Sequence, residues 1–353
     1  MNRSPAPSSS AARSGSLIVG LDVGGTKTNA TVLTTSGAFL IERMVEVPSQ
    51  VHEGPPAALE AIAEAMTAAL ASCRVDEDDV AAVGLATPGP ASAGGVISSK
   101  GATNFAERAW WSFDFRSAVE ARLQHPGVYS NDGNAAALYA HVRHCGPRVG
   151  ERSSIAAIVG TGLGGGVIER GAIIAGATGT AGELGHVHIP MEGLLAPGQP
   201  MPRCNCGFSG DLESIASLTG ITHNLLPYWL TQYPNHPLRQ VASIDAAAKA
   251  VRGYGEQGDE MARRIFEQQA MAIGRMFTIA ANFIDPDVFF VGGGVTEAEQ
   301  GFRDWFIDQV KVHTKLREEQ ASVCEFALVP DLDMAGARGA AINAMRTLGL
   351  HTI

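Results

Sequence analysis

The sequence has few cysteines and no long uninterrupted apolar run. Its five cysteines are irregularly spaced and too few for a disulfide framework in a chain of 353 residues. Glycine, proline or charged residues break every apolar run before it reaches the roughly 18 to 20 residues that a membrane-spanning helix needs. The first fourteen residues are rich in serine, alanine and proline and lack the apolar centre of a signal peptide. We therefore expect a disordered tail at 1–15 and a cytoplasmic protein with no membrane partner.

The chain also lacks a surplus of positive charge. It has 26 lysine and arginine residues against 36 aspartate and glutamate residues, which gives a formal net charge of -10 at pH 7. Nucleic acids and anionic membrane surfaces bind proteins through clusters of basic residues. A long polyphosphate chain is disfavoured for the same reason, although a local basic groove could still bind one. The composition therefore argues against all three as partners.

The commonest phosphate-binding loop is absent as well, because no Gly-x-x-x-x-Gly-Lys-Ser/Thr motif occurs. A different glycine-rich segment, Gly24–Thr28, lies between two apolar runs of strand length at 17–21 and 29–33. This placement predicts a hairpin turn, whereas Walker-type and dinucleotide-type loops lead directly into a helix. Hairpin glycines leave backbone amides open to a polyphosphate, and the last three residues of the segment add hydroxyl and ammonium donors. An ordinary Gly-Gly hairpin is the alternative.

Asp22 directly precedes this turn. A carboxylate beside phosphates would repel a nucleotide unless it acts on a magnesium ion, directly or through water. A second glycine-rich segment, Gly160–Gly166, follows another apolar run at 155–159. The two segments predict two phosphate loops. They also indicate a weak internal duplication, in which each half opens on a strand and a glycine-rich hairpin.

The length of the chain exceeds the size at which a single core keeps growing, so we expect two domains. Alternating strand and helix patterns predict an α/β class. Helices are expected over 55–72, 135–144, 258–284 and 335–348, and further strands over 80–85, 128–130 and 287–291.

Asn131 and Asp132 follow the predicted strand at 128–130. An aspartate at the carboxyl end of a strand lies where α/β proteins bind ligands, and it can accept the proton of an attacking hydroxyl. The positive end of the next helix would keep the carboxylate ionised, while Asn131 offers donor and acceptor groups to the same substrate. The alternative is an aspartate that caps a helix beginning near Asn134.

A third cluster contains a Cys-x-Cys pair, Cys204 and Cys206. Two close cysteines with a histidine before them and an acidic residue after them can complete a tetrahedral zinc site. His186 is the expected third ligand, and Asp211 is the candidate fourth, with His188 as its substitute. The alternative is two free thiols in a loop, because Cys-x-Cys is tighter than the usual Cys-x-x-Cys spacing.

Glu183 and Glu213 flank this cluster. Carboxylates, an amide and an imidazole could together hold a sugar ring with several hydroxyls. Each carboxylate could equally be a solvated surface charge. Their position beside a predicted metal site gives a functional role the same weight as that alternative.

In this order, the motifs resemble the ROK family (repressors, uncharacterised reading frames and kinases) of bacterial sugar kinases, within the actin-like ATPase superfamily. The resemblance extends from about Leu17 to the C-terminal helix. It implies a two-domain actin-like ATPase (ribonuclease H-like) fold with the active site in the interdomain cleft. Residues 16–132 plus 336–353 would form the N-terminal domain with the first phosphate loop. Residues 133–335 would form the C-terminal domain with the second loop and the sugar and zinc motifs.

The resemblance also implies a role for each motif. Asp132 matches the catalytic base, and Glu183-x-x-His186 matches the family's Glu-x-Gly-His signature. The implied sugar-binding residues are Thr103, Asn104, Asn131, Asp132, Glu183, His186 and Glu213. The implied nucleotide-binding residues are Asp22, Gly24, Gly25, Thr26, Lys27, Thr28, Gly160, Thr161, Gly162, Gly164, Gly165, Gly293 and Gly294, the last two from a nucleoside-side turn at Val291–Val295. The implied zinc ligands are His186, Cys204, Cys206 and Asp211.

Two features depart from the family pattern. The family's zinc motif runs Cys-x-Cys-Gly-x-x-Gly-Cys, whereas Asp211 stands at its last position here. The segment between His186 and Cys204 is also longer than usual, with a proline- and glycine-rich insertion at about 191–203. An insertion beside the sugar site could reshape specificity or act as a lid.

The activity implied by the resemblance is transfer of a phosphoryl group from ATP to the 6-hydroxyl of a hexose, with Mg2+ and a structural Zn2+. Glucose is the expected substrate, and N-acetylmannosamine, N-acetylglucosamine and mannose are the alternatives. Family members commonly form homodimers, so we expect one here. Repressors of the family carry a helix-turn-helix segment before the sugar domain, and only sixteen residues precede the first predicted strand. We therefore expect a kinase rather than a repressor or a non-catalytic sugar sensor.

Overall fold

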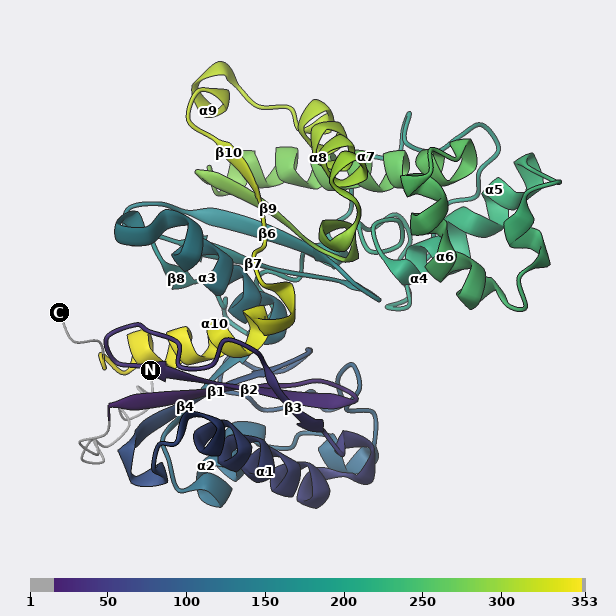
Figure 1. The fold of residues 1–353 in the computed structure, drawn as a ribbon. Coiled ribbons are helices and arrows are strands. Elements are labelled where there is room, and N and C mark those ends of the chain that lie inside the picture. The colour runs from purple at the N-terminus through teal and green to yellow at the C-terminus, as the bar shows by residue number, and fades with distance from the viewer. Residues whose placement is uncertain (1–15, 351–353) are drawn as a thin grey trace, which may run out of the picture. The chain divides into compact units, whose positions relative to one another are not determined.

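The computed structural model describes residues 16–350, and its chain divides into two compact units (Figure 1). Unit 1 contains the residues up to Asp132 and those from Gly336 onward, and unit 2 contains Gly133–Ala335. Each unit contains one five-stranded sheet with helices packed on it. The predicted α/β class is confirmed. Among the described residues, none of the helices combines the length and the apolar character that crossing a bilayer requires.

The sheet of unit 1 has the strand order β3-β2-β1-β4-β5. Strands β1 and β2 form an antiparallel hairpin, and β4 and β5 continue the sheet in parallel with β1. Two helices cover one face of this sheet and α10 covers the other (Figure 1). The elements are β1 (Leu17–Val23), β2 (Lys27–Thr34), β3 (Val45–Pro48), α1 (Pro55–Cys73), β4 (Val80–Thr87), α2 (Phe115–Leu123), β5 (Gly127–Asn131) and α10 (Leu332–Thr347), whose residues from Gly336 onward belong to unit 1.

Helix α10 packs closely on the sheet because two strands present glycines to it. A β-carbon on Gly20 of β1 would overlap the carbonyl oxygen of Ala337, and one on Gly84 of β4 would overlap that of Ala340. Both alanines are buried. The backbone of α10 therefore rests directly on β1, which leads into the first glycine-rich turn, and on β4, which pairs with β1.

The sheet of unit 2 has the order β10-β9-β6-β7-β8. Strands β6 and β7 form an antiparallel hairpin, and β9 and β10 extend the sheet in parallel with β6. The elements are α3 (Asp132–Cys145, of which all but Asp132 lie in this unit), β6 (Ser154–Val159), β7 (Leu163–Glu169), β8 (Ala172–Ile173), α4 (Leu218–Gly220), α5 (Leu226–Gln232), α6 (Ile244–Glu256), α7 (Glu260–Phe283), β9 (Val288–Gly293), α8 (Gln300–His313), α9 (Glu318–Ala321) and β10 (Glu325–Leu328).

Aromatic side chains contribute to the largely aliphatic core of unit 2. Phe277 of α7 packs on Phe289 of β9, with ring centroids 4.9 Å apart. On the other face of the sheet, α3 approaches β7 closely, because a β-carbon on Gly166 would lie 2.8 Å from that of Ala137. Buried aromatic area of this kind stabilises a domain core, so the sheet provides a rigid base for the turns at its edge.

The two sheets share one topology. In each, a hairpin of the first two strands forms the centre and two parallel strands follow on one side, as the orders β3-β2-β1-β4-β5 and β8-β7-β6-β9-β10 show. The predicted internal duplication is confirmed, and the turn of each hairpin is one of the two glycine-rich segments.

Three predicted boundaries were wrong. Helix α3 begins at Asp132 rather than at residue 135, and α10 begins at Leu332 rather than at 335. The second glycine-rich turn is shorter than predicted, because Gly164, Gly165 and Gly166 belong to strand β7. Two of these glycines are needed for packing: a β-carbon on Gly165 would overlap the carbonyl oxygen of Ala156, and one on Gly166 would lie 2.8 Å from Oδ1 of Asn134. The predicted tail at 1–15 lies outside the described residues.

Candidate active site and metal-ligand cluster

The first glycine-rich turn connects β1 to β2 in unit 1. Its backbone is closed by a hydrogen bond from the Gly24 N–H to the Lys27 carbonyl oxygen, at 2.9 Å. Thr26 is exposed, whereas Thr28 lies in β2 and is fully buried. The ammonium group of Lys27 forms an ion pair with Glu46 of β3. Of the three predicted side-chain donors, only Thr26 is therefore exposed without a side-chain partner among residues 16–350. Thr28 is buried, and Lys27 is paired with Glu46.

Asn104 lies against this turn although it is distant in sequence. A β-carbon on Gly25 would lie 2.6 Å from Cγ of Asn104 and 2.9 Å from its Oδ1. Asn104 has a positive φ of 67°, a conformation that asparagine adopts more readily than most residues. Its neighbour Thr103 donates its N–H to Gly89 O at 2.9 Å. The structure thus brings a predicted sugar-binding residue beside the predicted first phosphate loop.

Asp22 and Asp132 form a carboxylate pair in unit 1. Asp22 is in β1 and pairs with Ala86 of β4, and Asp132 follows β5, the neighbour of β4. Burial raises the pKa of Asp22 to about 7, and the negative charge of Asp132 adds to this effect. A carboxylate with a raised pKa next to a like charge is typical of functional sites, including sites that bind a cation.

Asp132 is the first residue of α3 rather than a cap that precedes a later helix. Its carboxylate therefore lies in the first turn, where the helix dipole favours negative charge. Asn131 is the last residue of β5, opposite Thr87 of β4. Both side chains leave the sheet at the carboxyl ends of parallel strands, which is where open α/β sheets bind their ligands.

The second glycine-rich turn, Gly160–Gly162, connects β6 to β7 in unit 2. The Gly160 N–H donates to Gly162 O at 2.9 Å, which closes a tight turn. Gly293, the last residue of β9, pairs with Val159 and has a φ of 102°, which side chains rarely adopt. A β-carbon there would also overlap the carbonyl oxygen of Val159. The two turns that were predicted to bind nucleotide are therefore neighbours at one edge of this sheet.

Arg252 of α6 reaches the turn after β9 and was missed in the sequence. Its Nη1 donates to Gly294 O at 2.5 Å and lies 3.4 Å from Glu297. Gly336 was missed as well, although it lies against Asp22: a β-carbon on Gly336 would come within 2.7 Å of Cγ of Asp22. Neither residue lies in a glycine-rich or metal-binding motif. For Gly336, the run of small residues at 335–337 was the one sequence signal of close packing.

Four predicted metal ligands come together in unit 2. One ligand atom from each of His186, Cys204, Cys206 and Asp211 lies within 4.8 Å of the others. Nδ1 of His186 is 3.4 Å from Oδ2 of Asp211 and 3.9 Å from Sγ of Cys204, and Sγ of Cys206 is 3.5 Å from the same Oδ2. The alternative fourth ligand, His188, instead packs its ring against Phe208, at 5.9 Å between centroids.

The surroundings of this metal-ligand cluster favour a cation. Asp211 is fully buried, and its Oδ1 accepts the N–H of Ser214 at 3.1 Å. Burial raises the pKa of the Cys204 thiol, so this sulfur stays protonated unless a cation binds it. Two sulfurs, an imidazole nitrogen and a carboxylate oxygen form a donor set that suits tetrahedral zinc.

The two predicted sugar-binding glutamates lie on either side of the cluster. Glu183 directly precedes the short helix Leu184–His186, which positions the imidazole of His186. Glu213 has contacts in two directions: its Oε2 accepts the N–H of Leu163 at 2.9 Å, and its Oε1 accepts from Sγ of Cys204 at 3.5 Å. Glu213 is therefore not a solvated surface charge.

The insertion at 191–203 is fastened to the helical part of unit 2. Gln268 of α7 donates to Leu194 O at 2.9 Å and to Oε1 of Gln199 at 2.7 Å. The indole N–H of Trp229 donates to Gln268 at 2.8 Å, and the Tyr228 hydroxyl donates to Pro197 O at 3.1 Å. Buried amide contacts of this kind rigidify a segment when all partners are satisfied.

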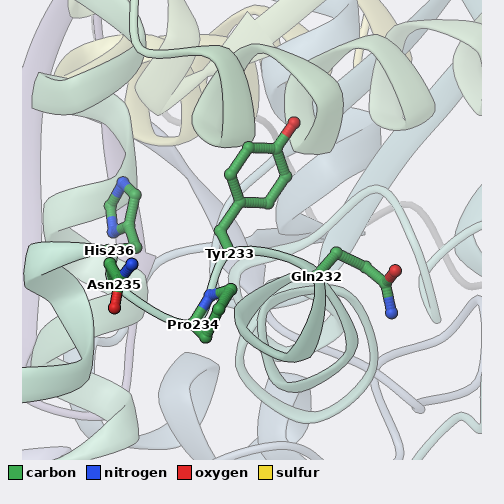
Figure 2. Close-up of a pocket in the computed structure, with 5 residues that line it drawn as sticks. All are labelled: Gln232, Tyr233, Pro234, Asn235 and His236. Atoms are coloured by element: carbon green, nitrogen blue, oxygen red, sulfur yellow. The ribbon is translucent and has the colours of Figure 1, made fainter.

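A surface pocket of about 300 Å³ is lined by the consecutive residues Gln232–His236 (Figure 2). His236 has structural partners on both ring nitrogens: Nε2 lies 3.2 Å from Asp259, and Nδ1 accepts the N–H of Leu238 at 3.1 Å. None of the residues predicted from the motifs lines this pocket. It therefore does not contribute to the candidate site.

Comparison of the whole chain with known proteins agrees with these motifs. The family model named ROK family matches residues 18–347. This chain belongs to the ROK family. Its ROK relatives include a glucokinase of Halalkalibacterium halodurans, which is 30% identical over 307 residues, or 84% of either chain.

Solved structures agree with this membership. The ROK hexokinase from Thermus thermophilus has a TM-score of 0.72 and 30% identity, and the match covers 94% of this chain and 99% of that one. A ROK family glucokinase from Streptomyces griseus, in complex with glucose and AMPPNP, has a TM-score of 0.69 and 26% identity over 94% of this chain and 99% of that one. These neighbours share the predicted ROK fold.

Proposed function

We propose that this protein transfers the γ-phosphoryl group of ATP to the 6-hydroxyl of a hexose, with glucose as the substrate and Asp132 as the general base. One observation carries the proposal: Asp132 begins α3 at the carboxyl end of β5, in a carboxylate pair with Asp22 and in the unit that holds the first glycine-rich turn. The relatives named glucokinase, and the neighbour solved with glucose and AMPPNP, support the choice of glucose and ATP.

The pair of Asp22 and Asp132 fits a magnesium ion. Magnesium is usually held by one or two carboxylates together with substrate phosphates and water. The raised pKa of Asp22 reflects burial and a neighbouring negative charge, both of which a divalent cation would offset. When bound there, Mg2+ would neutralise charge on the phosphoryl group that is transferred.

The His186, Cys204, Cys206 and Asp211 cluster fits a structural zinc ion, because all four donor atoms lie within 4.8 Å of one another. Such an ion would fix the orientation of the imidazole of His186. We propose that the imidazole and the neighbouring Glu183 bind hydroxyls of the sugar.

In the proposed mechanism, the carboxylate of Asp132 accepts the proton of the 6-hydroxyl as its oxygen attacks the γ-phosphorus. This carboxylate lies in the first turn of α3, where the helix dipole favours negative charge. Asn131 and Asn104 orient the sugar. Backbone N–H groups of the turns at Gly24–Gly25 and Gly160–Gly162 bind the phosphates, which positions the reacting groups and stabilises charge, the two main sources of catalysis in this reaction class.

The test is an ADP-release assay with Mg-ATP against glucose, mannose, N-acetylglucosamine and N-acetylmannosamine. We compare the wild type with Asp132→Asn and with Asp245→Asn, a matched control that changes an exposed aspartate in the first turn of α6. Loss of a general base costs roughly 10²- to 10⁴-fold in rate, so Asp132→Asn should lose at least this much while the control retains activity. Equal activity in both variants would exclude Asp132 as the base, and turnover with another sugar alone would replace glucose.

A further inference from the structure

Glu213 joins the metal-ligand cluster to the second glycine-rich turn. One carboxylate oxygen, Oε2, accepts the N–H of Leu163, the residue after the turn, at 2.9 Å. The other oxygen, Oε1, lies 3.5 Å from Sγ of Cys204 in the cluster. The backbone N–H of Glu213 donates to Gly185 O at 2.8 Å, next to His186. Each carboxylate oxygen of Glu213 therefore has its own partner: Leu163 at the second glycine-rich turn and Cys204 in the metal-ligand cluster.

The turn is shaped to receive this carboxylate. A β-carbon on Gly162 would lie 2.5 Å from Oε2 of Glu213, so any larger residue would push the carboxylate away from the Leu163 N–H. Glycine at this position is required by the close approach of the side chain rather than by a positive φ.

The rest of the turn is held by the segment that follows Glu213. The N–H groups of Leu218 and Thr219 donate to Gly160 O and Thr161 O, each at 3.0 Å, and the Thr219 hydroxyl donates to Thr161 O at 2.8 Å. The Ser217 hydroxyl in turn donates to the carbonyl oxygen of Glu213 at 2.7 Å. Gly160 and Thr161 of the turn, and Leu163 after it, are thus attached to a single short stretch, 213–219, that begins two residues after a predicted metal ligand.

We propose that Glu213 is a positioning residue that couples occupancy of the metal-ligand cluster to the second glycine-rich turn, so that a bound metal ion tightens the binding of nucleotide phosphates there. A cation bound by His186 and Asp211 fixes the backbone on both sides of Glu213, because the Glu213 N–H donates to Gly185 O, next to His186, and the N–H of Ser214 donates to Asp211. A fixed carboxylate holds the Leu163 N–H and hence the conformation of the turn. The identity of the turn's ligand rests on the proposed kinase function.

The coupling predicts that substitutions of Glu213 change the affinity for nucleotide, whereas a sugar contact predicts that they change the affinity for glucose. Glu213→Gln retains an amide oxygen that can accept from Leu163 and an NH₂ group that can face Cys204. Glu213→Leu has a similar volume and removes both contacts. The matched control is Asp259→Ala, which removes a carboxylate that accepts the Ala262 N–H at 2.8 Å elsewhere in unit 2.

The experiment is a calorimetric titration of each protein with the Mg2+ complex of AMPPNP, and separately with glucose, in zinc-loaded and chelator-treated forms. A hydrogen bond to a charged group contributes enough for about a tenfold change in affinity. We expect zinc removal to weaken AMPPNP binding about tenfold in the wild type and in Asp259→Ala. Glu213→Leu should bind AMPPNP about tenfold more weakly even with zinc, and zinc removal should not weaken it further. Glu213→Gln should stay within about threefold of the wild type.

Two results would overturn the proposal. One is a Glu213→Leu variant that loses glucose affinity but binds AMPPNP as the wild type does, which would make Glu213 a sugar contact alone. The other is wild-type nucleotide affinity that does not depend on zinc. Hydrogen exchange at the amides of 160–166 separates these outcomes from failure of the proposed function. Faster exchange on zinc removal in the wild type, but not in Glu213→Leu, supports the coupling even if the protein phosphorylates no sugar, and unchanged exchange refutes it.

Discussion

The carboxylate of Asp22 lies directly against the backbone of Gly336, with no space between them for a side chain. A β-carbon on Gly336 would overlap Oδ2 of Asp22 and come within 2.7 Å of its Cγ. Asp22 is in β1 and Gly336 is in α10, so a contact between distant parts of the chain sets the position of a predicted magnesium-site carboxylate.

Gly336→Ala should therefore impair magnesium use as well as stability. The methyl group has to displace a short side chain that cannot swing away, and overpacking of this kind typically costs about 1–3 kcal/mol. We expect a higher Mg2+ concentration for half-maximal activity, together with a lower melting temperature. The control is Gly301→Ala in α8, where a β-carbon meets nothing within 4 Å. An unchanged Mg2+ requirement in Gly336→Ala would show that packing at Gly336 does not affect the magnesium site.

The pKa of Asp22 predicts a pH dependence of stability in the absence of divalent cations. Its pKa is raised from 3.8 to about 7, first by burial and then by Asp132. The folded chain therefore keeps this proton at pH values where the unfolded chain has lost it, so the contribution to the free energy of unfolding falls as pH rises from about 4 to about 7. Denaturant unfolding in EDTA should show this decline for the wild type, and Asp22→Asn should lack that component. A variant with the same pH profile as the wild type would refute the prediction.

Replacing the carboxylate ligand should change the preference of the metal-ligand cluster. Asp211→Cys would supply a third thiolate to a site that already offers two sulfurs and one imidazole, and thiolates favour zinc. We expect tighter zinc binding in competition with a chelator, and a thiolate charge-transfer band of the cobalt-substituted protein that rises roughly in the ratio three to two. Cys73→Ser, which changes a cysteine outside the cluster, should leave both readings unchanged. An unchanged cobalt band in Asp211→Cys would show that position 211 does not bind the metal ion.

Gln268 should determine how firmly the insertion at 191–203 is held. Gln268→Leu leaves the carbonyl group of Leu194 and the indole N–H of Trp229 without their present partner, and an unsatisfied buried group costs about 1–3 kcal/mol. We expect faster proteolysis within the insertion and a smaller effect on the rest of unit 2. Gln300→Leu, at an exposed position in α8, serves as the control. Equal cleavage rates in the two variants would show that other contacts fasten the insertion.

Local patterns in the sequence were sufficient for the main elements and for most of the candidate site. Apolar runs on either side of Gly24 and Gly160 predicted both hairpins, because strand pairing through a tight turn depends on adjacent residues. The spacing of His186, Cys204 and Cys206 likewise predicted a cluster that the structure assembles. The start of α3 was predicted three residues late, because Asp132-Gly133-Asn134 is typical of a loop or cap, and packing of α3 on the sheet overrides that preference.

What the sequence determined by itself was the family, the two glycine-rich hairpins and the residue types available for a kinase and a metal site, since these depend on short motifs and on their order. The tertiary structure alone decided which of these residues touch. It placed Gly336 against Asp22, assigned Gly164–Gly166 to a strand rather than a turn, and set Glu213 between Cys204 and Leu163. Such contacts join residues far apart in the chain, and they are determined by how helices and sheets pack rather than by local preference.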